Sequence, residues 1–417
     1  MTVRTCVALL VLVLIGAGCA RRAASTPSNS ATQPMALPRG PHADAIERGV
    51  KFLVRSQQPE GCWGTGLETR GLEIYSMVPG SHDAFRVATT ALCVMALREA
   101  YDLPVPGLRE AHARGVQYLV RNGEARRDDG RLLYNVWAHT YALQALSVEL
   151  RHHHDPRVEA MARWHLDRMI RYATYVGGWN YYDFKAQTQR PSLGPTSFGT
   201  AAGLVALWEA RRAGLQVPQS LIDASLRRVM EMRLPIGVYL YSLDHRYIPR
   251  LPANQIKGAV GRTQPCNYAL WLWGYQGIGE AQVRQGLDLF FEHHAFLDMA
   301  RKRPWPHEAW YQNSAYYYYF DHYYAALLVE RLSPAARSEY AARLAAHVAP
   351  YQEPDDGSWW DYAMWDYHKP YGTAFAVMTL LRCDAALGAQ QPGNGGFDAH
   401  RPAECRTILG ASTFPDS

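Results

Sequence analysis

Charged residues are scarce: they make up 19% of the 417 residues, against roughly 25% in average globular proteins. Because 48% of the residues are hydrophobic, the chain is not intrinsically disordered. Long apolar runs are absent beyond the N-terminus and the mean hydropathy is −0.27, which excludes a polytopic membrane protein. No long basic block occurs, and the net charge is only +5. We therefore expect no nucleic-acid partner.

Tyrosine is the residue in excess, with 26 copies in the chain. A tyrosine ring is apolar, but its hydroxyl group needs a hydrogen-bond partner or water. The excess therefore predicts extensive half-buried surfaces or an aromatic-lined cavity.

The N-terminus has the pattern of an export signal. Arg4 precedes an apolar run over residues 6–15, which is too short to span a bilayer comfortably. The segment Gly16-Ala17-Gly18-Cys19 resembles a bacterial lipobox, which implies lipidation of Cys19, although Gly16 stands where that motif usually has Leu. Cleavage near Ala20 is the alternative. We expect an export signal at 1–18 and a Ser/Thr/Ala/Pro-rich linker at 19–41, and hence a lipid-anchored protein on the periplasmic side of the cell envelope, or otherwise a secreted one.

The other end is a Gly/Pro-rich tail, residues 388–417. Its Cys405 could form a disulfide with Cys383 in an oxidising compartment, or both could remain thiols.

Between these ends, residues 42–387 alternate two kinds of helical segment. Six are amphipathic and charged, and we expect them near residues 45–53, 108–120, 158–172, 219–232, 281–296 and 335–348. Six others are nearly uncharged and rich in small residues, beginning near Thr89, Thr140, Thr200, Tyr268, Tyr323 and Thr373. A helix that is apolar all round must be surrounded by protein, whereas an amphipathic helix faces water. The pattern predicts an all-α domain in which six helical hairpins form two concentric rings, an α/α toroid.

A glycine-aromatic motif recurs between the two kinds of helix. It is clearest in Gln58-Pro59-Glu60-Gly61-Cys62-Trp63, in Gly178-Trp179 and over residues 352–359, from Gln352 to Trp359. Glycine permits the sharp reversal after a helix. We expect the aromatic ring to pack under the next hairpin and the Gln side chain to cap the preceding helix.

These motifs resemble those of the terpenoid cyclase and protein prenyltransferase toroid superfamily, whose triterpene cyclases carry repeated Q-W motifs. The resemblance covers residues 45–387 and implies the toroid fold. It does not imply one activity, because the same ring is used by several classes of protein.

The chemistry of the cyclases and prenyltransferases is incomplete in this chain. The D-x-D-D motif of squalene-hopene-type cyclases is absent, and Asp128-Asp129 and Asp355-Asp356 read as solvated turns. By resemblance, Cys266 could belong to a prenyltransferase-type zinc site with His322 or His368, but Gln264 replaces the expected Asp. We therefore expect no metal site and treat zinc as disfavoured; the cofactor is unknown.

Polar residues gather at the starts of the six apolar helices, at the expected mouth of the ring. We predict that Asp321, His322, His139 and His368 are catalytic and that the ligand-binding residues are His82, Asp83, Asn267, Tyr319, Tyr323 and Tyr371. Thr196, Ser197, Asn135, Cys266 and Asp366 occupy matching positions. Titratable groups that converge in one concavity are typical of an active or binding site. Capping of helix N-termini is an alternative explanation for several of these residues.

Three functions remain open. The first is binding or processing of an apolar or amphipathic ligand, such as an isoprenoid, lipid or acyl-peptide, in the central cavity. The second is a carbohydrate-active enzyme that takes a glycan, because aromatic rings and carboxylates also describe a glycan cleft. The third is a non-catalytic scaffold. Whether the protein is an enzyme is left open by the sequence.

Overall fold

The computed structural model describes residues 39–67, 80–125, 133–185, 188, 190–191 and 194–388. Within them the protein is helical, and β-structure is limited to isolated bridges. Asp128-Asp129, the expected export signal with Cys19, and Cys405 lie outside the described residues. The proposed domain boundaries and the disulfide therefore stay predictions.

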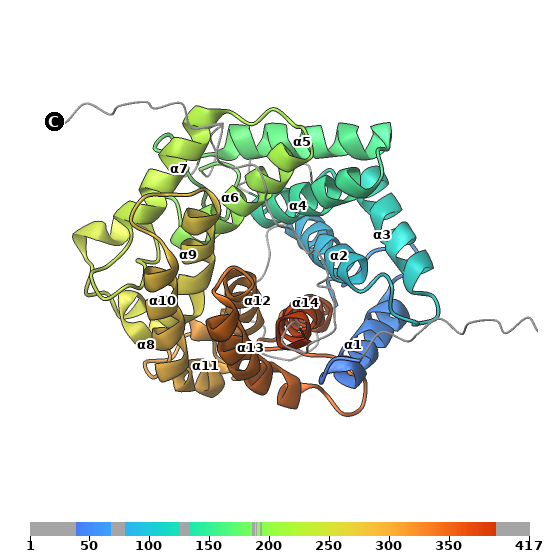
Figure 1. Ribbon diagram of the computed structural model, residues 1–417. Coiled ribbons are helices and arrows are strands. Elements are labelled where there is room, and N and C mark those ends of the chain that lie inside the picture. The colour runs from blue at the N-terminus through green and yellow to red at the C-terminus, as the bar shows by residue number, and fades with distance from the viewer. Residues whose placement is uncertain are drawn as a thin grey trace, which may run out of the picture. The chain divides into compact units, whose positions relative to one another are not determined.

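Twelve helices form the two expected rings, one inside the other (Figure 1). The inner helices are α2 (Ser81–Glu99), α4 (Val136–His152), α6 (Ser197–Arg212), α9 (Thr263–Leu272), α12 (Tyr318–Val329) and α14 (His368–Gly388). The outer helices are α1 (Ala43–Ser56), α3 (Leu108–Asn122), α5 (Pro156–Tyr172), α7 (Gln219–Glu231), α10 (Glu280–Glu292) and α13 (Pro334–Val348). The α/α toroid predicted from the alternation is confirmed.

Short elements interrupt the regular alternation in the second half of the ring. They are η1 (Leu243–Tyr247), η2 (Pro252–Asn254), α8 (Ile256–Ala259), η3 (Val260–Arg262), α11 (Ala295–Ala300), η4 (Ser314–Tyr316) and η5 (Ala349–Tyr351). The expected outer helix over 281–296 is thus divided into α10 and α11.

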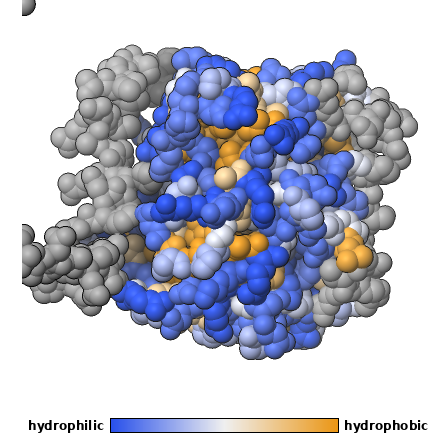
Figure 2. All heavy atoms as spheres, turned by 90° about the vertical axis from the view of Figure 1, so that its right-hand side faces the viewer, coloured by the Kyte–Doolittle hydropathy of each residue, from blue (hydrophilic) through white to orange (hydrophobic). Residues whose placement is uncertain are grey.

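Burial follows the charge pattern that distinguishes the two rings. In α1 only one face is buried, including Ile46, Val50 and Leu53 at a spacing of three or four residues. In α12, by contrast, every residue from Tyr318 to Val329 is buried. The outer helices therefore cover the inner ones and expose their charged faces. On the side of the domain drawn in Figure 2, where α1 and α3 lie, the surface is mostly hydrophilic. Among the described residues, no helix is long and apolar enough to cross a bilayer.

A tryptophan after each motif glycine fastens the outer ring to the inner ring. The indole N–H of Trp359 donates to the carbonyl of Val348 in α13 (2.9 Å), while its backbone N–H donates to the hydroxyl of Thr373 in α14 (2.9 Å). Trp63 makes the equivalent bonds to Leu53 and Thr90, and Trp179 makes them to Met169 and Thr200. One buried side chain thus ties the end of an outer helix to the first half of an inner helix.

Two of these tryptophans, Trp63 and Trp359, also contact the following hairpin, as expected. A Cβ added to Gly115 of α3 would lie 2.8 Å from the Trp63 ring, and one added to Gly49 of α1 would lie 2.6 Å from the Trp359 ring. Glycine is needed at both positions because the ring occupies the space of a side chain. The contact of Trp359 with α1 joins the last hairpin to the first.

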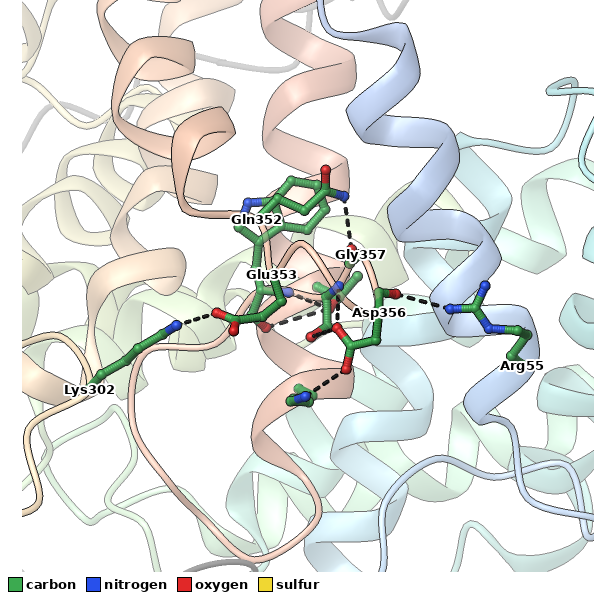
Figure 3. Close-up of polar contacts among 10 residues, drawn as sticks. Arg55, Lys302, Gln352, Glu353, Asp356 and Gly357 are labelled. Atoms are coloured by element: carbon green, nitrogen blue, oxygen red, sulfur yellow. Dashed lines mark hydrogen bonds and ion pairs between the residues drawn. The ribbon is translucent and has the colours of Figure 1, made fainter.

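The motif glutamine bridges two hairpins rather than capping the preceding helix. The amide of Gln352 donates to the carbonyls of Gly357 (2.8 Å, Figure 3) and of Ala45 in α1 (2.9 Å). In the first copy of the motif this role falls to Gln57, not to Gln58, since Gln57 donates to the carbonyls of Gly61 and of Ala111 in α3. The glutamine satisfies carbonyl groups in its own turn and in the next outer helix.

Ion pairs link neighbouring inner helices at their C-terminal ends. Arg382 of α14 bonds to Glu99 of α2 (2.9 Å), and Arg98 of α2 bonds to Glu149 of α4 (2.9 Å). Arg151 of α4 continues the series to Glu209 of α6 (2.8 Å). Charged contacts therefore join α14, α2, α4 and α6 at this end of the ring, whereas the opposite end carries the candidate site.

Candidate functional site

An arc of aromatic rings lies at the N-terminal ends of the inner helices. Its members touch in sequence, with ring centroids 4.8–6.4 Å apart; they are Phe85, Tyr134, Tyr181, Tyr241, Phe198, Tyr317, Tyr316 and Tyr362. We call this set the aromatic arc. It begins on α2, passes through the loops before α4 and α6, the start of α6, the segment between α7 and η1 and the residues just before α12, and ends in the loop before α14.

The first part of the arc is a stack of half-buried rings. Phe85 and Tyr134 are 5.2 Å apart and inclined by 22°, and Tyr134 and Tyr181 are 5.1 Å apart and inclined by 13°. The hydroxyls of Tyr181 and Tyr241 hydrogen-bond to each other. Burial raises the pKa values of Tyr134 and Tyr181 well above 10, so both hydroxyls are neutral and able to donate. The faces of Tyr134 are covered by its two stacked neighbours, so the arc offers ring edges together with hydroxyl groups.

Below the arc, aromatic side chains fill the middle of the ring. Trp137 of α4 lies 6.0 Å from Phe320 of α12, although these two helices are not neighbours in the inner ring. Tyr141 of α4 similarly contacts Phe375 of α14 at 6.1 Å. Since both contacts cross the ring, the aromatic surface accessible to a ligand lies at the mouth and not in the centre.

The predicted catalytic residues are buried; His139 and His322 lie between the two rings, and Asp321 lies against the inner helix α9. Asp321 accepts a hydrogen bond from the backbone N–H of Gln264 (3.1 Å), and burial raises its pKa well above the usual range. The ring of His139 contacts that of His165 in α5 (3.0 Å between Nδ1 atoms). His322 contacts His294 beside α11 (3.1 Å between Nε2 atoms). Burial lowers the pKa values of His139 and His322, so both are neutral at pH 7.

His368 is the predicted catalytic residue nearest the mouth loop. It is buried, its Nδ1 donates to the carbonyl of Trp365 (2.6 Å), and its ring meets Trp360 edge-on. The four residues therefore occupy equivalent helix starts without converging on one point. Their catalytic role remains a prediction.

The predicted ligand-binding residues divide into mouth and interior positions. His82 contacts the Tyr367 hydroxyl (3.2 Å), and Asp83 is exposed and paired with Arg86 (3.1 Å). Three others are buried: Asn267 accepts from the Tyr239 hydroxyl (2.8 Å), whereas Tyr319 and Tyr323 pack in the core. The structure thus brings His82 to the mouth and places Asn267 between layers.

Tyr371 leads to an acidic residue that the sequence reasoning missed. Its hydroxyl donates to Oδ1 of Asp361 (3.0 Å), which also accepts from the backbone N–H of Tyr362 (2.8 Å). Burial raises the pKa of Asp361 to about 6, close to the range in which a carboxyl group serves as acid or base. Tyr362 is the last member of the arc. A signal existed: Asp361 follows Trp359 at the spacing at which Tyr181 follows Trp179.

The zinc ligands suggested by the resemblance, Cys266 with His322 or His368, do not form a metal-binding group among the described residues. The thiol is buried and donates to the carbonyl of Arg262 (3.4 Å). Burial raises its pKa far above 9, whereas a zinc ligand must be a thiolate. Among the described residues, the one group of three metal-ligating side chains lies elsewhere, at His294, Asp298 and His347.

No protein-family model and no curated protein matches the chain. Solved structures do match in fold. A D-mannose isomerase is 13% identical and covers 83% of this chain and 96% of its own, with a TM-score of 0.52. The GH76A α-1,6-mannanase of Salegentibacter sp. HEL1_6 is 10% identical and covers 82% and 99%, with a TM-score of 0.50. The type II terpene cyclase MstE from Scytonema is 16% identical and covers 83% and 98%, with a TM-score of 0.47. The helix arrangement and the two matches with TM-scores of 0.50 and 0.52 confirm the α/α-toroid fold implied by the sequence resemblance.

Proposed function

We propose that the aromatic arc binds a small ligand that carries hydroxylated rings, such as a short glycan. The observation that carries this proposal is the stack of half-buried rings from Phe85 to Tyr181, which lies above a centre filled by aromatic side chains. The ring edges can pack against the apolar faces of a sugar, and neutral tyrosine hydroxyls can pair with its hydroxyl groups. A long isoprenoid would instead need a deep apolar hole.

Asp361 is the group that could give this site chemistry. With a pKa of about 6, it can hold or accept a proton near neutral pH. Glycoside hydrolysis needs a second carboxyl group within about 5–9.5 Å. The proposal is therefore binding, with proton transfer by Asp361 as its catalytic extension.

Direct binding measurements test the proposal. We would titrate the purified chain with α-1,6-mannotetraose, which the mannanase binds, with other short oligosaccharides, and separately with a fatty acid and an isoprenoid alcohol. We expect saturable binding of an oligosaccharide that weakens at least tenfold in Tyr134→Ala and persists in Tyr134→Phe. Tyr175→Ala is the matched control, because that ring is 72% exposed and outside the arc.

The outcomes separate the three functions. Binding of the apolar probes alone would refute the glycan proposal and favour an apolar ligand. Absence of binding to every probe would favour a scaffold that uses the outer surface.

We further propose export and lipid anchoring through Cys19, based on the N-terminal pattern. Metabolic labelling with a fatty acid should modify the wild type but not Cys19→Ser. Labelling of both chains would refute anchoring at this residue.

A further inference from the structure

Three histidines and one aspartate meet between the outer and inner rings, away from the aromatic arc. His294 directly precedes α11, Asp298 lies within that helix, His322 lies in α12, and His347 lies in the last turn of α13. His294 and His347 have ring centroids 3.7 Å apart. Nδ1 of His294 lies 2.8 Å from Oδ2 of Asp298.

His322 and Asp298 hold the two ring nitrogens of His294. The carbonyl oxygen of Tyr318 can only accept, so Nδ1 of His322 carries a hydrogen and donates to it (2.6 Å). Nε2 of His322 therefore faces Nε2 of His294 (3.1 Å). Nδ1 of His294 is the ring nitrogen turned toward Asp298.

Nδ1 of His294 lies only 2.8 Å from Oδ2 of Asp298. Two acceptors at this distance repel each other unless a positive species lies between them. The cluster therefore requires a cation at this position, either a proton or a metal ion.

The surroundings favour a metal ion. The Tyr351 hydroxyl donates to Oδ1 of Asp298 (3.4 Å), and the Tyr318 hydroxyl, which donates to the carbonyl of His347 (2.8 Å), lies 3.2 Å from the same oxygen, which leaves Oδ2 available as a ligand. Such outer hydrogen bonds orient ligands at metal sites. One ligand atom from each of His294, Asp298 and His347 lies within 4.8 Å of the others. The Asp298 side chain is 34% exposed, which provides a path for the ion.

We propose that His294, Asp298 and His347 bind a divalent transition-metal ion, with zinc as the best match. Two imidazoles and one carboxylate are ordinary zinc ligands, and three protein ligands leave a fourth position for water. Ligand atoms around a tetrahedral zinc ion lie about 3.3 Å apart, from metal–ligand distances of about 2.0–2.1 Å. Oδ2 of Asp298 therefore moves by about half an ångström when the ion enters. His322 is a positioning residue that directs Nδ1 of His294 toward the ion.

Zinc titration of the chelator-treated, untagged full chain tests this site. We expect one ion per chain by calorimetry and native mass spectrometry. Affinity should fall at least tenfold in Asp298→Asn and in His347→Ala. His293→Ala is the matched control, because this neighbouring histidine lies beside Glu292 instead (3.8 Å). Circular dichroism checks that each variant is folded, and His347→Gln serves as a second variant if the alanine variant is not.

Cobalt(II) gives an independent readout. Bound to the wild type, it should produce the visible absorption of a four-coordinate site, and His347→Ala should abolish it. Absence of zinc binding to the wild type would mean that a proton bridges His294 and Asp298, and would overturn the proposal. Equal zinc affinity in the wild type and both ligand variants would overturn it as well, because the ion would then be bound elsewhere. Neither result bears on the aromatic arc.

Discussion

The tryptophan that closes the ring gives the sharpest test of the fold. In an open array the last hairpin has a neighbour on one side only, so its contacts contribute less than those of an internal hairpin. In this structure Trp359 contacts Gly49 of the first outer helix just as Trp63 contacts Gly115 of the second. Closure therefore predicts that equivalent substitutions at Trp359 and Trp63 cost the same free energy.

The cost of Trp→Phe can be worked out from the contacts. Loss of the indole N–H leaves the buried carbonyl of Val348, or of Leu53 in the first copy, without its partner, which costs about 1–3 kcal/mol. The smaller ring leaves a void that costs about 1 kcal/mol more. We expect Trp359→Phe and Trp63→Phe each to lower the free energy of unfolding by about 2–4 kcal/mol, on the sum of these two effects.

Urea denaturation followed by circular dichroism measures this change. Trp310→Phe is the control, since that side chain is 71% exposed and should give a change near zero. If Trp359→Phe behaved like the control while Trp63→Phe was strongly destabilised, the first and last hairpins would not be joined in solution. The closed toroid would then be refuted.

Three further outcomes follow from the structure. Gly49→Ala should lower the free energy of unfolding by about 1–3 kcal/mol through overpacking, because its Cβ would lie 2.6 Å from Trp359; Gly388→Ala, with no atom within 4 Å of the added Cβ, should be neutral in the same urea assay. Burial disfavours the charged form of Glu149, but hydrogen bonds from His112 and Arg98 outweigh it and lower the pKa to about 2. The free energy of unfolding should therefore fall as the pH is lowered from about 4.5 to about 2, and this fall should shrink in Glu149→Gln. Burial raises the pKa of Asp361 from 3.8 to about 6, so its effect on the pH dependence of stability has the opposite sign. The unfolded chain loses this proton more readily than the folded one, and the free energy of unfolding should therefore fall as the pH rises from about 4 to about 6. Asp361→Asn should remove that fall, and an unchanged pH profile would contradict the assignment.

The helical repeat predicted where the candidate site lies and that aromatic rings surround it, but it did not predict which acidic residue lies there. The tyrosine excess and the positions of the inner-helix starts predicted aromatic rings around the mouth, where Tyr134, Tyr181 and Tyr316 lie. Asp361 was missed because its spacing from Trp359, the signal that the sequence offered, does not show whether a carboxyl group is buried or lies in a solvated turn. Its raised pKa results from the burial that the whole ring imposes.

The sequence by itself determined the fold, because charge and apolarity alternate between whole helices and each motif glycine precedes a tryptophan. These are local patterns, and any chain that buries six apolar helices behind six amphipathic ones must form two layers. Only the tertiary structure decided where individual side chains point. Successive residues on a helix differ in direction by about 100°, so neighbouring positions serve different surfaces: Tyr317 joins the arc, whereas Tyr318 and His322 face the His294 cluster. That cluster unites residues from three helices, and their meeting depends on how the two rings pack together.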